Sequence, residues 1–211
     1  MQLAGQAVSV YNRSRNSNPE FALMSPDAHP VLGVFASDFG PGDAERATIM
    51  SQAGSFLARK GAKLVCLAED GVVPVPLVTS ARTAGGEVVV IADAAYEEPS
   101  AFAGVKVEHL PAATDRVTRL ATLAHLYVAL PGSLASATSL FRTWVKGGSG
   151  AARKPVIFLD RNGAFKVLRG YAGDVLSNSL KGQDRYVQFA DSVEDIWNKV
   201  NWLVDQGATA L

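Results

Sequence analysis

Seven short apolar runs, set between helical patterns, constrain the fold of this chain more than any other feature. The runs lie at residues 31–37, 62–68, 87–93, 106–110, 126–132, 155–160 and 186–190. Most are nearly continuous in Val, Ile, Leu and Phe, which is typical of strands buried on both faces of a parallel sheet. Helical patterns occupy residues 43–60, 76–84, 113–124, 134–146 and 192–206. The alternation predicts an α/β fold with a doubly wound, mostly parallel sheet of about seven strands and helices on both faces.

Capping signals support two of these helices. Gly61 follows the helix predicted for residues 43–60 and is a plausible C-cap. The last helix begins after Ser192, with Asp195 three residues on, which approximates a capping box, and Gly207 is its predicted end.

Length and composition limit the class of protein. The 211 residues are 48% hydrophobic, which suits one domain at residues 29–211, preceded by an arm or extra edge strand at 1–28. Lys+Arg and Asp+Glu both number 20, and this balance argues against a dedicated nucleic-acid binder. The single cysteine, Cys66, lies in an apolar run and reads as a buried strand thiol. No run is long enough to serve as a signal peptide or to cross a membrane, so we expect a cytoplasmic protein.

The loop after the first strand is one candidate binding site, because doubly wound sheets bind ligands beyond the carboxyl ends of their strands. Ser37 ends the strand, and Gly40-Pro41-Gly42 precedes the next helix. Glu45 stands where a dinucleotide fingerprint would have its third glycine, so the loop gives no support for NAD. The helix start can hold an anion, or the segment is a plain glycine-rich turn capped by Asp43.

The loop after the fifth strand is the stronger candidate. It reads Pro131-Gly132-Ser133 and continues into a helix start with hydroxyls at Ser136 and Thr138. Free N–H groups and hydroxyls there suit a phosphate, although they also serve as ordinary caps. Arg116 and Arg119, three apart on the preceding helix, either contact that phosphate or are solvated. The three histidines have no metal-ligand spacing, so we expect neither a metal nor a cofactor, and His125 reads as a structural residue.

The order of these motifs resembles the lonely-guy family of phosphoribohydrolases, also described as lysine-decarboxylase-like, and the related molybdenum-cofactor carrier proteins. Segments that carry the resemblance are Val34-Phe35-Ala36-Ser37-Asp38, Ala84-Gly85-Gly86-Glu87-Val88, Ala129-Leu130-Pro131-Gly132, Lys154-Pro155-Val156 and Asn162-Gly163-Ala164-Phe165. Arg116 falls where the family has an arginine on the helix before its A-L-P-G-G strand end. The resemblance covers about residues 31 to 203. It implies a Rossmann-like fold and a homodimer formed through helices that flank the site.

The chain departs from this family at the catalytic motif. The family pattern P-G-G-x-G-T-x-E-E reads here as residues 131–139, with Thr138 and Ser139 in place of both acids. Cleavage of an N-glycosidic bond builds positive charge on the ribose, and a neutral hydroxyl does not supply the carboxylate that stabilises it. The resemblance with these losses favours a non-catalytic protein that binds a nucleotide or another phosphorylated small molecule.

Two alternatives remain open. Glu69 or Asp70, at the end of the second strand, is a substitute carboxylate for a nucleoside 5′-monophosphate phosphoribohydrolase. A purely structural or interaction module is the other. On the helix after the Pro-Gly turn, Leu140, Phe141 and Trp144 are either dimer contacts or core residues.

Overall fold

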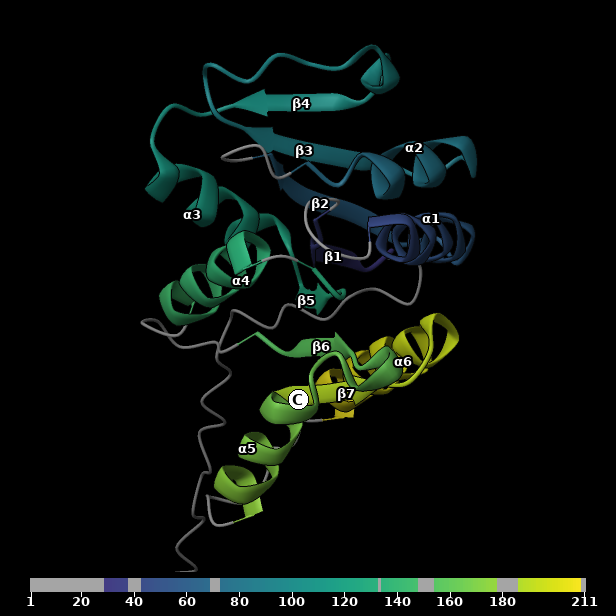
Figure 1. Cartoon of the computed structure of the whole chain (residues 1–211), viewed down its shortest axis with the longest axis vertical. Helices are drawn as coiled ribbons and strands as arrows, with labels where there is room; N and C mark the ends of the chain where they lie inside the picture. The colour runs from purple at the N-terminus through teal and green to yellow at the C-terminus, as the bar shows by residue number, and fades with distance from the viewer. Residues whose placement is uncertain are drawn as a thin grey trace, which may run out of the picture.

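The computed structural model describes residues 29–37, 43–68, 73–132, 134–147, 154–177 and 186–209. Its centre is a sheet of seven strands in the order β4-β3-β2-β1-β5-β6-β7 (Figure 1). Every neighbouring pair is parallel, so the predicted doubly wound α/β fold is confirmed and the sheet is wholly rather than mostly parallel. The strands are β1 (Val31–Phe35), β2 (Lys63–Ala68), β3 (Val88–Ala92), β4 (Lys106–His109), β5 (Leu126–Ala129), β6 (Val156–Leu159) and β7 (Val187–Ala190). The arm or edge strand predicted for residues 1–28 lies outside the described residues.

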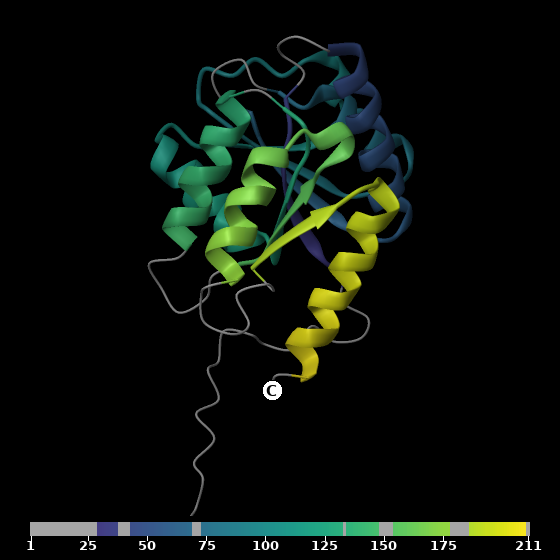
Figure 2. The ribbon, with the colours of Figure 1, turned by 60° about the horizontal axis from the view of Figure 1, so that its bottom comes forward.

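Helices cover both faces of the sheet, as Figure 2 shows. The helices α1 (Asp43–Arg59), α2 (Val75–Thr83) and α6 (Val193–Thr209) pack on one face. The opposite face carries α3 (Ala113–Leu123), α4 (Leu134–Gly147) and α5 (Lys166–Ser177). Two short 3₁₀ turns, η1 (Ser100–Phe102) and η2 (Arg161–Gly163), complete the described elements. No helix in the described part of the chain is both long and apolar enough to span a membrane.

The capping residues predicted for two helices agree with the structure, except that one capping bond is shifted and the last helix is longer. Gly61 has a φ of +86°, the left-handed conformation that a glycine C-cap adopts. The Asp195 N–H donates to Ser192 Oγ at 3.1 Å, which is the capping bond expected for α6. The Asp195 carboxylate accepts the N–H of Asp191 at 3.2 Å, one residue earlier than in a standard capping box. The helix continues to Thr209, past the end predicted at Gly207.

The single cysteine is structural, as predicted. Cys66 is fully buried on β2, and burial raises the pKa of its thiol to about 12. A thiol with so high a pKa carries little reactive thiolate at neutral pH.

His125 links the beginnings of the two central strands. Its Nδ1 accepts the N–H of Val31 at 3.1 Å, and its own backbone N–H donates to the Val31 carbonyl at 2.8 Å. The predicted structural role of His125 is therefore confirmed. Partial desolvation and, second, the charge of Lys154 lower the pKa of His125.

This lowered pKa gives a pH dependence of known sign. The unfolded chain takes up the His125 proton first as the pH falls, so the contribution of His125 is present above its unfolded pKa and is lost in acid. His109 acts in the opposite direction, because hydrogen bonds from its ring to the Asp93 carbonyl and to Glu98 raise its pKa. Urea unfolding between about pH 5 and pH 8 checks both signs. We expect His125→Gln to flatten the acid side of the stability profile and His109→Gln to flatten the alkaline side. An unchanged acid limb in His125→Gln would contradict the assignment.

Candidate functional site

The strand order of the sheet reverses between β1 and β5. From β1 the chain runs outward through β2, β3 and β4, and α3 then returns it to the other side of β1. The backbone N–H of Leu130 donates to the Phe35 carbonyl at 2.9 Å, so both strands end at neighbouring points. The described ends of β1 and β5 therefore lie side by side. This reversal is where doubly wound sheets bind ligands.

A cavity of about 250 Å³ lies at this reversal, against the carboxyl ends of β1, β5 and β6 and between α4 and α5. Its described lining consists of Phe35, Ala129, Leu130, Gly132, Ser136, Ala137, Leu140, Phe141, Phe158, Phe165 and Leu168. Four of these are phenylalanines, and Ser136 is the one polar side chain among them. An apolar slot with a hydroxyl at one side has the general character of a small-molecule site.

The predicted phosphate turn borders this cavity. Ser136 is 5% exposed and lies against Gly132, where an added Cβ would be only 2.4 Å from the Ser136 Oγ. Position 132 therefore has no room for a side chain unless Ser136 moves. Pro131 is half-buried before the turn, whereas Thr138 faces outward on α4. Ser133 lies outside the described residues.

The two arginines of α3 have different environments. Arg116 is 6% exposed and donates from Nη1 to the carbonyl oxygens of Leu110 and Pro111 at 2.8 and 2.9 Å. It is not among the residues that line the cavity. Arg119 instead forms a two-pronged contact with Glu108 of β4, Nε to Oε2 at 2.7 Å and Nη2 to Oε1 at 3.1 Å. Arg119 and then Lys106 lower the pKa of Glu108 to about 2.

Several predicted residues of the other loops fall outside the described part of the chain. Ser37 is fully buried just after β1, next to the strand reversal. Gly40 and Gly42 belong to the loop that follows, and Glu69 and Asp70 to the loop after β2, and none of the four is described. Their proposed roles rest on the sequence alone.

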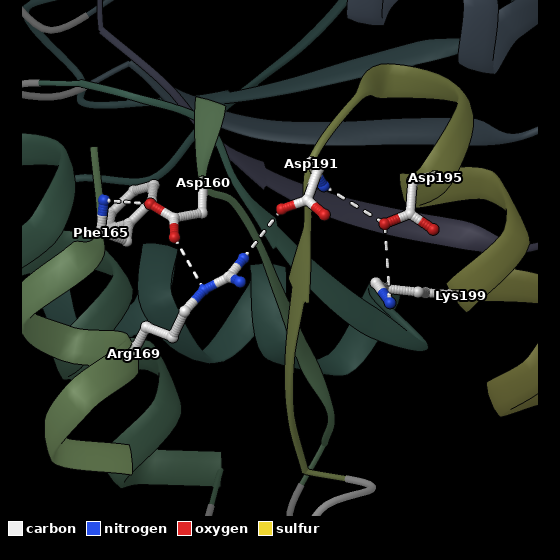
Figure 3. Close-up of polar contacts among 6 residues, drawn as sticks. All are labelled: Asp160, Phe165, Arg169, Asp191, Asp195 and Lys199. Atoms are coloured by element: carbon white, nitrogen blue, oxygen red, sulfur yellow. Dashed lines mark hydrogen bonds and ion pairs between the residues drawn. The ribbon is translucent and has the colours of Figure 1, made fainter. Parts of the chain in front are cut away.

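Asp160 is the carboxylate that follows β6, the strand whose Phe158 lines the cavity. Its Oδ1 accepts the N–H of Phe165 at 2.7 Å, and its Oδ2 contacts Arg169 Nε at 2.8 Å (Figure 3). Both oxygens are engaged on the α5 side, and Asp160 is absent from the lining. Within the described residues, the cavity is therefore lined without a carboxylate.

Sequence reasoning missed the aromatic part of the site. Phe158 and Phe165 meet edge-on with ring centres 5.0 Å apart, and Leu168 of α5 completes that wall. The sequence signal for Phe165 was its position in the Asn-Gly-Ala-Phe turn, which the family resemblance already included. The α5 helix itself was not predicted.

Comparisons with known proteins indicate the fold. No family model matches the chain, and no curated protein matches its sequence. The structure is similar to the molybdenum cofactor carrier protein of Chlamydomonas reinhardtii, with a TM-score of 0.62 and 18% identity over 84% of this chain and 99% of that one. The molybdenum cofactor binding protein of the phototrophic bacterium Rippkaea orientalis gives a TM-score of 0.62 and 17% identity, over 84% and 99% of the two chains. The structural-genomics target TM1055 gives 0.57 and 21%, over 82% and 99%. At such identities the likeness establishes a shared Rossmann-like fold.

Proposed function

We propose that this protein is a non-catalytic binding protein of the lonely-guy and molybdenum-cofactor-carrier type, and that its ligand is a nucleotide or another phosphorylated small molecule. The observation that carries the proposal is the cavity at the strand reversal, which lies beside the Gly132 turn and lacks a carboxylate among its described lining residues. Two proteins that share the fold are described as a carrier and a binding protein for the molybdenum cofactor, which supports binding as the function.

The phosphate would lie on the turn before α4. Gly132 allows close approach of the backbone, and the helix start that follows supplies N–H groups and the partial positive charge that favour an anion. Ser133, Ser136 and Thr138 are the hydroxyl donors in this assignment. On the neighbouring loop, Ser37 and the Gly40–Gly42 turn would contact the same group. Arg116 would add a charge-assisted contact from the adjacent helix.

The loss of the two motif acids favours binding over hydrolysis. Loss of one electrostatic stabiliser raises a reaction barrier by roughly 2–4 kcal/mol, and the family pattern places two acids where this chain has Thr138 and Ser139. Asp160 does not replace them, because Arg169 and the Phe165 N–H occupy its oxygens.

Titration calorimetry with AMP and with adenosine tests the phosphate assignment. We expect AMP to bind and adenosine to bind more weakly by roughly tenfold or more. The reason is that one charge-assisted hydrogen bond to the phosphate contributes at least the free energy of a tenfold change in affinity. Arg116→Ala should weaken AMP binding by a similar factor. The matched control is Arg119→Ala, which removes an arginine from the same helix that is already paired with Glu108. Equal affinities for AMP and adenosine would contradict the proposal.

The second candidate function is hydrolysis of a nucleoside 5′-monophosphate with Glu69 or Asp70 as the acid. Both residues follow directly after β2 in the sequence, and β2 pairs with β1, which favours them over carboxylates elsewhere in the chain. Release of base from AMP that is lost in Glu69→Gln or in Asp70→Asn would establish this reading.

The same proposal includes a homodimer through α4 and α5. Phe141 is 64% exposed, and Tyr171 and Val167 of α5 are 67% and 87% exposed, whereas Leu140 is buried and belongs to the core. Trp144 has no described side chain. We expect sedimentation to give a dimer, and Phe141→Glu to shift it toward monomer because a charge cannot be buried there without a partner. A monomeric wild-type protein would contradict this part.

A further inference from the structure

The turn between β6 and α5 is held by one buried carboxylate. The Asp160 side chain is 6% exposed, and its two oxygens bind the Phe165 N–H and Arg169 Nε. Between Asp160 and Phe165 in the sequence, Asn162 and Gly163 have φ values of +55° and +71°, so the turn passes through two left-handed residues. A single side chain thus fixes both the residue before α5 and the first turn of that helix.

Arg169 extends this contact to β7, as Figure 3 shows. Its Nη2 donates to Asp191 Oδ1 at 3.0 Å, and its guanidinium lies 5.1 Å from the centre of the Phe189 ring. Phe189 stacks on Phe158 with centres 5.5 Å apart and planes 24° apart, and Phe158 meets Phe165 edge-on. A polar chain and a chain of rings therefore connect the same three elements, and the chain of rings ends at the cavity wall.

We propose that Asp160 and Arg169 are positioning residues for the ligand site. They hold Phe165 and Leu168, and with them the α5 wall of the cavity, without contacting the ligand. The inference rests on the proposed function for the identity of the ligand. The contacts described above support the part that concerns the position of the α5 wall.

The contacts of Asp160 and Arg169 fix geometry more than they add stability. The pair joins a buried Asp160 to an Arg169 side chain that is 44% exposed, and it adds little net stability, because solvent screens the arginine and desolvation of the carboxylate offsets the attraction. Its directional hydrogen bonds nevertheless fix geometry. In catalytic sites, a misplacement of about 1 Å lowers the reaction rate up to a hundredfold, which shows how strongly a site depends on the position of its walls. Gly170 and Gly173 weaken the intrinsic helical preference of α5, so the position of this helix depends on contacts outside it.

The experiment uses full-length protein labelled with 4-fluorophenylalanine, with AMP as the ligand probe. Fluorine NMR reports the environment of the Phe165 ring, whose resonance is assigned by its loss in Phe165→Leu. The variants are Asp160→Ala, Asp160→Asn, which keeps an acceptor for the Phe165 N–H, and Arg169→Gln. Lys199→Met is the control, because it removes an ion pair with Asp195 in the same region but away from the cavity wall.

We expect Asp160→Ala to shift or broaden the Phe165 resonance and to weaken AMP binding by roughly tenfold or more under conditions where the variant is fully folded. Asp160→Asn should shift the resonance less than Asp160→Ala, and Lys199→Met should change neither reading. If Asp160→Ala does not fold, Asp160→Asn and Arg169→Gln give the same two readings. An unchanged resonance, or a shifted one with unchanged AMP affinity, overturns the proposal. If wild-type protein does not bind AMP, the proposed function fails, while the Phe165 resonance still decides whether the pair positions the wall.

Discussion

Replacement of Gly54 by alanine should lower the free energy of unfolding by about 3 kcal/mol, at the upper end of the cost of overpacking. Gly54 lies on α1 where that helix crosses α2. A Cβ at this position would be 2.3 Å from the Leu77 carbonyl oxygen and 2.4 Å from the Ser80 Oγ. Because the Leu77 oxygen belongs to the backbone of α2, relief requires the two helices to separate, and their shared core opens with them.

Two controls make this prediction specific. The double variant Gly54→Ala/Ser80→Ala removes the hydroxyl but keeps the Leu77 clash, so it should remain destabilised. Gly170→Ala places a methyl group on α5 where no atom beyond the neighbouring residues and the backbone of the helix itself lies within 4 Å, and it should stabilise the protein by up to about 1 kcal/mol through helix propensity. Urea unfolding followed by circular dichroism measures both. A Gly54→Ala variant as stable as wild type would contradict the close helix crossing.

Replacement of Gly132 by alanine should affect the site more than the fold. Its Cβ would meet the Ser136 Oγ at 2.4 Å, but that atom is the end of a side chain and can rotate away. We expect a stability loss of about 1–2 kcal/mol and a loss of AMP affinity of roughly tenfold or more, because the methyl group occupies the close-approach position.

The double variant Gly132→Ala/Ser136→Ala separates these effects. Without the hydroxyl, the nearest remaining atoms are about 3.5 Å from the added Cβ, which is ordinary contact. Unfolding measurements should therefore show most of the stability restored, while calorimetry with AMP should show binding still weak. Wild-type affinity in the double variant would mean that the turn serves helix packing alone.

Much of the fold was predictable because its signals are local. The seven apolar runs correspond one for one to the strands, and each strand ends within about three residues of the predicted boundary, as expected for element limits. The loss of alternation in those runs identified a sheet covered on both faces. The alternation of strands and helices also predicts a sheet whose strand order reverses. At that reversal Phe35 and Leu130 lie at neighbouring strand ends.

The helix α5 was not predictable in the same way. Its sequence contains Gly170 and Gly173, which disfavour a helix in isolation. The helix is anchored at Asp160 through Arg169, and Leu168 packs against the core. Tertiary contacts of this kind override local preference, and no window of sequence reveals them.

The strand–turn–helix element around Gly132 was predictable from the sequence, but the residues that surround it were not. The turn at Gly132 and the buried Ser136 lie where the strand–turn–helix pattern put them. The apolar wall around them comes from strands and helices distant in the sequence, so only the fold assembles it. The hydrogen-bond partners of a side chain were not predictable either. Arg116 lies on the predicted helix, but the sequence does not show that its Nη1 donates to the Leu110 and Pro111 carbonyls.

The most direct measurement of the central claim incubates purified full-length protein with AMP and follows both binding and release of adenine in the same samples. The account predicts saturable binding of AMP, weaker binding of adenosine, and adenine release no faster than in buffer. Adenine release that turns over and disappears in Glu69→Gln or Asp70→Asn would contradict it, because a carboxylate from outside the described lining residues would then act on the ligand.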